Sequence, residues 1–194
     1  MKPADVQDFS SFVSELHRES DRGLALVGGA LIDDRLLETL RAFFCEGVAS
    51  KRLLEDGAAP LGTFSSRSDA CFALGLIDAF EHREIALIRK VRNEFAHAKH
   101  GMSFKTAKVA GFCSTLASDL PLGSDYPINE PRFRFTNAVV VMASRLYYRP
   151  AWVEKERRQG KSWVDPKDVR WRSIDEEMPP SGLPVIGMAK RQPR

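Results

Sequence analysis

The sequence predicts an all-α fold, a single multi-helix bundle domain followed by an irregular C-terminal tail. Apolar side chains recur at spacings of three and four residues over most of residues 5–148, which is typical of amphipathic helices. The valine run at residues 139–141 lies in a longer stretch whose apolar spacing favours a helix over a strand. With 194 residues, 43% hydrophobic and 28% charged, the chain has the size and composition of one globular domain.

The first two predicted helices cover residues 5–20 and residues 21–46. Asp21 is suited to cap the second of them. The apolar positions of the first helix share one face, and they are Val6, Phe9, Phe12, Val13 and Leu16. Gly28 and Gly29 interrupt the second helix and indicate a close helix crossing, because no strand precedes them as a phosphate-binding loop would require.

The middle of the chain predicts two further helices. Residues 47–64 form a connection that contains one helical turn, and Ser65 or Ser66 caps a short helix after it. Asp78 begins the next helix, which ends near His97 among basic residues suited to a helix C-terminus. The last two helices of the domain are predicted at residues 104–120 and 132–148, on either side of a loop.

The predicted domain boundary lies at residue 148. The helical domain, residues 1–148, carries 18 Lys and Arg against 19 Asp and Glu, whereas the extension 149–194 carries 11 against 7. This basic extension contains tryptophans, clustered prolines and a predicted short charged helix at residues 153–159, before an irregular tail. The near-neutral domain disfavours simple binding of nucleic acid by the folded part.

Composition and cysteine usage narrow the class of protein. No apolar run reaches the roughly 18 residues of a membrane-spanning helix, and the N-terminal residues lack a secretory apolar region. We therefore expect a cytoplasmic protein without membrane attachment. Cys45, Cys71 and Cys113 lie among apolar neighbours and indicate reduced core thiols. No cysteine or histidine spacing indicates a metal site, and no cofactor is expected.

Three segments of the helical domain carry a resemblance to a known family. They are residues 30–40, 64–77 and 88–97, with the sequences ALIDDRLLETL, FSSRSDACFALGLI and IRKVRNEFAH. In this order and spacing they resemble the mannitol operon repressor family of bacterial transcriptional regulators. The extension after Tyr148 departs from that pattern, which leaves open the operon that the protein serves.

The resemblance implies an all-helical fold without a recognisable DNA-binding motif. It also implies a regulator rather than an enzyme, which represses sugar-alcohol uptake genes through contacts with a protein partner. A homodimer and direct contact with DNA or RNA stay open. The candidate residues for binding a partner or ligand are Arg89, Arg92, Asn93, His97, Ser65 and Arg67.

The third segment also resembles the motif of HEPN domains, helical modules that cleave RNA without a metal. Arg92, Asn93 and His97 match the arginine, the polar neighbour and the histidine of that motif. His97 would act as a general acid or base on a 2′-hydroxyl, and Arg92 would stabilise the charged phosphorane. Such domains build the site from two subunits, so this alternative implies a dimer.

Helical geometry gives the same residues a structural interpretation. Arg92 and His97 are separated by about 140° around a helix, whereas Arg89, Asn93 and His97 share one face. Arg92 would then bond to an acidic helix, Asn93 to a loop backbone and His97 to the end of its own helix. A protein-binding regulator, an HEPN-type ribonuclease toxin or defence protein, and an assembly module remain as alternatives.

Overall fold

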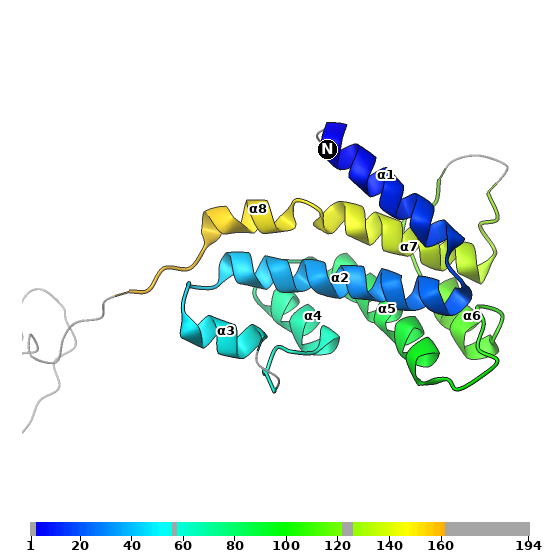
Figure 1. The fold of residues 1–194 in the computed structure, drawn as a ribbon, viewed down its shortest axis with the longest axis horizontal. Coiled ribbons are helices and arrows are strands. Elements are labelled where there is room, and N and C mark those ends of the chain that lie inside the picture. The colour runs from blue at the N-terminus through cyan, green and yellow to red at the C-terminus, as the bar shows by residue number, and fades with distance from the viewer. Residues whose placement is uncertain (1–2, 56–57, 122–125, 162–194) are drawn as a thin grey trace, which may run out of the picture. The chain divides into compact units, whose positions relative to one another are not determined.

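The computed structural model describes residues 3–55, 58–121 and 126–161, and it confirms the all-α fold (Figure 1). Within these residues no strand is present, and no helix is long and apolar enough to cross a membrane. The elements are α1 (Pro3–Arg18), α2 (Asp21–Phe43), α3 (Val48–Leu54), α4 (Phe64–Ala73), α5 (Ala79–His97), α6 (Ala107–Ser114), α7 (Pro131–Leu146), α8 (Arg149–Val153) and the 3-10 helix η1 (Glu154–Glu156).

Helix α2 is the centre of the bundle. It contacts α4 and α5 on one side and α7 and α8 on the other (Figure 1). Its buried apolar residues meet those of α5 and α7 in one core, whose largest fully buried side chains include Leu24, Ile32, Leu36, Leu40, Ile85, Ile88, Phe95, Phe135, Met142 and Leu146. Burial of such a set of large apolar side chains is the main force that holds the helices together.

The glycine pair of α2 lies at close helix crossings, as predicted. A Cβ atom added at Gly28 would lie 3.1 Å from Cγ2 of Val139 on α7. A Cβ atom added at Gly29 would lie 2.7 Å from Cγ of Arg92 on α5, closer than real side-chain contacts allow. The two glycines therefore let α5 and α7 approach the same helix from two directions.

The predicted N-caps of two helices were wrong by one to three positions. Ser20, not Asp21, caps α2, because its backbone is extended and its Oγ accepts a hydrogen bond from the Gly23 N–H at 3.0 Å. Thr63, not Ser65 or Ser66, begins α4, in a capping box whose second member is Ser66. Asp78 caps α5 as predicted.

Helix α6 is shorter than the predicted helix at residues 104–120 because a buried carboxylate holds the chain that follows it. Glu84 of α5 is fully buried and accepts hydrogen bonds from the N–H groups of Ala117 and Ser118 at 2.9 and 3.0 Å. These backbone donors are thereby satisfied outside a helix, so the chain leaves the helical path after α6.

The bundle continues past residue 148. Arg149 of α8 binds the fully buried Glu81 at 2.8 Å, and the Arg158 N–H donates to the carbonyl of Phe43 at 2.8 Å. The compact unit that contains the core runs to Gln159. In place of the helix predicted at residues 153–159, the structure has α8 and η1, and the predicted tail after residue 161 lies outside the described residues.

Candidate functional site

Three of the candidate residues gather where α2, α4 and α5 meet. Arg67 of α4 donates from Nη1 to Oδ1 of Asp33 on α2 at 3.0 Å, while Arg92 of α5 lies against α2 one turn away, at Gly29. Arg92 also donates to the side-chain oxygen of Asn93 at 3.2 Å. We call Asp33, Arg67, Arg92 and Asn93 the α2/α4/α5 cluster.

Arg67 ties two parts of the chain together within this cluster. Its Nε donates to the carbonyl of Leu61 at 2.9 Å, in the connection before α4, and its Nη1 reaches Asp33. The side chain of Arg67 is only 12% exposed. A charge-assisted, mostly desolvated pair of this kind fixes the start of α4 on α2.

Asp33 is the functional candidate that the sequence interpretation missed. Burial raises the pKa of its carboxyl above the ordinary value of 3.8, and the guanidinium groups of Arg67 and Arg92 oppose that rise. The fold therefore keeps a carboxylate in a place that disfavours its charge, as binding and catalytic sites often do. The sequence feature that could have identified Asp33 is its position four residues after Gly29, which places it on the side of α2 that meets α5.

Arg89 and His97, the other candidates on α5, differ in exposure. Arg89 is half-buried, and His97 is exposed in the last helical turn. Neither makes a hydrogen bond or ion pair with any residue that the structure describes. The carbonyl at the helix end, that of Ala98, accepts from Arg22 of α2. His97 is thus free to contact a partner molecule.

Ser65 is not hydrogen-bonded to the residues of the α2/α4/α5 cluster. It lies half-buried in the first turn of α4, and it forms no hydrogen bond with another described residue. The cap that it was expected to supply is made by Thr63 and Ser66. Its place on α4 is two residues before Arg67, on a different face of the helix.

Two acidic side chains in the middle of α2 are ion-paired. Asp33 binds Arg67 at 3.0 Å, and Glu38 binds Arg35 at 2.8 Å. Across the described ranges, no group of three His, Cys, Asp or Glu side chains could hold a metal ion.

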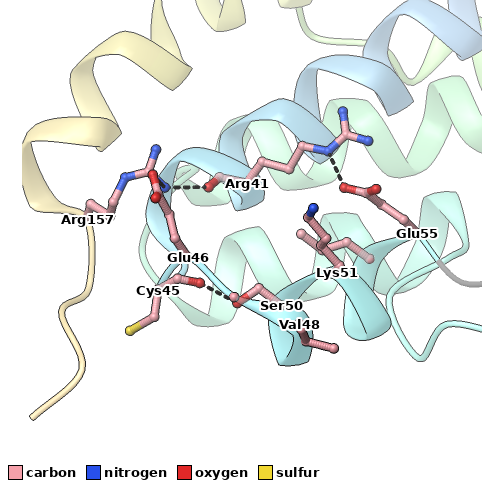
Figure 2. Close-up of a pocket in the computed structure, with 10 residues that line it drawn as sticks. Arg41, Cys45, Glu46, Val48, Ser50, Lys51, Glu55 and Arg157 are labelled. Atoms are coloured by element: carbon pink, nitrogen blue, oxygen red, sulfur yellow. Dashed lines mark hydrogen bonds and ion pairs between the residues drawn. The ribbon is translucent and has the colours of Figure 1, made fainter.

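A cavity of about 500 Å³ at the end of α2 is an alternative site (Figure 2). Its wall contains Arg41, which binds Glu55 at 3.0 Å, and Arg157, which binds Glu46 at 3.3 Å. These arginines are paired with carboxylates in the same wall, and Lys51 is the one wall cation without an ion pair among the described residues. A neighbouring cavity of about 590 Å³ includes Arg67 in its wall.

The three cysteines differ in accessibility. Cys71 and Cys113 are buried free thiols, and burial raises the pKa of each to about 12, against weaker opposing effects of Arg149 and Arg134. Cys45 is also free but only half-buried, and it lines the cavity at the end of α2. Two of the three predicted core thiols therefore lie in the core, and the third lies at its edge.

Comparison with known proteins adds one similar structure. No protein-family model and no curated protein matches the sequence. Among solved structures, the chain is similar to one described as the X-ray structure of the MtlR-HPr complex from Escherichia coli. The identity is 21%, the match covers 75% of this chain and 98% of that chain, and the TM-score is 0.49.

Proposed function

We propose that this protein is a repressor-like transcriptional regulator of a carbohydrate or sugar-alcohol operon that acts by binding another protein. The observation that carries the binding role is the stripe of Arg89, Asn93 and His97 along one face of α5, in which Arg89 and His97 form no hydrogen bond or ion pair with any described residue. The operon assignment rests on the resemblance of residues 30–40, 64–77 and 88–97 to the mannitol operon repressor family.

A protein-binding role fits the chemistry of this surface better than a small-ligand role. Small ligands are usually held in concave, mostly apolar pockets with a few convergent polar groups. Arg89, Asn93 and His97 instead follow one another along a helix face at four-residue spacing. Arginine at such surfaces is a frequent source of binding energy between proteins, because its fork of donors binds carboxylates and carbonyls in a fixed geometry.

Deletion of the gene tests the proposed regulation. We expect transcripts of sugar-alcohol uptake genes to rise in the deletion strain and to fall again when the wild-type gene is restored. Restoration with Arg89→Glu should fail, since this change reverses a charge that forms no ion pair with any described residue. Restoration with Arg52→Glu, an exposed charge on α3, is the matched control and should succeed.

DNA binding separates indirect from direct regulation. The purified protein alone should bind its own upstream DNA no more tightly than unrelated DNA, with a dissociation constant on the order of 10⁻⁵ M at physiological salt. Tight binding to the upstream region without a partner, weakening steeply with salt, would contradict the proposal. Unchanged transcripts in the deletion strain would contradict it as well.

The second candidate function is an HEPN-type ribonuclease toxin or defence protein. It is supported by the exposure of His97 and by the absence of any bonded partner for it among the described residues. In one chain, the contact of Arg92 with Gly29 directs its stem toward α2, so a second copy would have to complete the site. Growth arrest on expression, relieved by His97→Ala and accompanied by RNA cleavage in vitro, would establish this function in place of the first.

A further inference from the structure

A band of positive charge covers the C-terminal half of α5 and the loop after it. Residues 89–108 contain six Lys or Arg residues and a single acidic residue, Glu94. The net charge of the whole chain is only +3, so the concentration in this stretch is local. Such a concentration creates a field that attracts negatively charged partners.

Few of these charges are neutralised within the fold. Glu94 binds Lys108 at 2.7 Å, and no second carboxylate is present in the stretch. Arg89, Lys99 and Lys105 form no ion pair with any residue in the described part of the chain. Lys99 and Lys105 are exposed, so their charges are available to a partner.

Helix α2 extends the band across a seam with α5. The Arg22 guanidinium donates to the carbonyl of Ala98, and Gly29 lies against Arg92, so α2 and α5 run antiparallel along their shared length. Arg22 is itself exposed and makes no ion pair with the described residues. Its charge therefore stands beside Lys99 at the same end of the seam.

Helix α4 covers only the other end of this seam. It meets α2 at Asp33 and meets α5 at His82, where Asp69 binds the imidazole at 2.9 Å. Toward the C-terminus of α5 the seam is open, as the exposure of Ala96 shows. The small side chain at this position leaves room for a partner chain to lie close to both helices.

The geometry points to an acidic protein segment as the partner of this surface, lying along the seam between α2 and α5 with its carboxylates on Arg22, Arg89 and Lys99. This inference rests on the proposed function and names the chemistry of the partner. Arg89, Asn93 and His97 span about 12 Å along the helix, with one step for each turn. A helical segment with acidic residues four apart matches that spacing.

Two features favour a protein segment over nucleic acid. Proteins that hold single strands stack bases on exposed aromatic rings, whereas Phe95 and Phe104, the aromatic residues of the band, are buried. Proteins that hold duplexes neutralise many phosphates, whereas residues 1–148 as a whole have a slight excess of acidic residues. A short acidic segment needs only the few cations that the band offers.

Fluorescence anisotropy on the full-length protein tests the inference. The probes are a labelled 18-residue helical peptide with glutamates at four-residue spacing and a labelled oligouridylate of equal charge, each at low and at physiological salt. We expect the peptide to bind more tightly than the RNA. Arg89→Glu with Lys99→Glu should weaken peptide binding by about tenfold or more, because like charges then face each other.

The matched control is Arg52→Glu with Lys155→Glu, which reverses two exposed charges outside the band. It should change peptide affinity less than about twofold. Circular dichroism melting of both double variants confirms that they fold, and Arg89→Gln with Lys99→Gln serves if the reversed pair does not. The inference would be overturned if the two double variants changed peptide affinity equally. It would also be overturned by tighter binding of the RNA than of the peptide, or by no peptide binding to the wild type at low salt.

The same data separate this inference from the proposed function. If deletion of the gene changes operon transcripts but the acidic peptide does not bind, the acidic partner is wrong and the regulatory role stands. If the peptide binds in the expected manner while transcripts do not respond, the surface is correctly described and the regulatory role is wrong.

Discussion

Substitution of Gly29 by alanine should move Arg92 and destabilise the bundle. The added Cβ would lie 2.7 Å from Cγ and 3.0 Å from Cβ of Arg92. Those atoms belong to the stem of the side chain, next to the α5 backbone, so relief requires the two helices to separate. We expect Gly29→Ala to displace the guanidinium of Arg92 from the α2/α4/α5 cluster without changing any charge.

The magnitude follows from two opposing effects. Alanine in place of glycine inside a helix raises the free energy of unfolding by about 1 kcal/mol. Overpacking at a close helix contact costs about 1–3 kcal/mol. The expected net result is a loss of about 1 kcal/mol in the free energy of unfolding, or roughly 3 °C in Tm for a chain of this size.

Gly111→Ala is the matched control. Gly111 lies in α6, and a Cβ added there would meet no atom within 4 Å. Only the helix-propensity effect remains, so this variant should be more stable than the wild type by about 1 kcal/mol. Urea denaturation followed by circular dichroism measures both, and the two alanines should differ by about 2 kcal/mol in opposite directions. If Gly29→Ala is as stable as Gly111→Ala, the close contact between Gly29 and Arg92 does not constrain the helices.

Three further perturbations test the charged and thiol groups. Glu81→Gln leaves Arg145 and Arg149 without their buried carboxylate and should lower the free energy of unfolding by about 3 kcal/mol in urea denaturation. A loss of less than about 1 kcal/mol would mean that water already screens these ion pairs. At pH 8, Ellman's reagent should label Cys45 first, while Cys71 and Cys113, with pKa values raised to about 12, react only on unfolding. Above pH 9 the thiols of Cys71 and Cys113 ionise in the unfolded chain but not in the folded one. The free energy of unfolding should therefore fall as pH rises toward 12. The pKa of Asp33 is raised in the folded state, so the wild type should lose stability relative to Asp33→Asn as pH rises from 3.8 through that raised value. Urea denaturation at a series of pH values measures this difference. A relative gain in stability over the same range would mean that the arginine neighbours of Asp33 outweigh its burial.

Local signals in the sequence were enough to predict the helices. The capping box of Asp78 and Glu81 spans four residues, and the periodic apolar residues of α5 define its buried face, so both can be recognised within one segment. The early end of α6 could not be predicted in this way, because it depends on the carboxylate of Glu84, which lies 33 and 34 residues before the N–H groups that it binds.

The difference between local signals and long-range contacts also explains why Asp33 was missed at the candidate site. Arg92 and Asn93 are neighbours in sequence and were identified together. Asp33 was not among the candidate residues, and its partner Arg67 is 34 residues away. Their meeting depends on how α4 packs on α2 and α5, and no property of either short segment encodes that packing by itself.

The buried carboxylate of Glu81 also imposes an order on the completion of the fold. Its two arginine partners, Arg145 and Arg149, follow it by 64 and 68 residues. While the ribosome is still adding α6 and α7, the beginning of α5 holds an acid that has no cation to meet, and burying it then would be costly. We therefore expect the emerging chain to bury Glu81 late, when α8 is present and both arginines can bind the carboxylate.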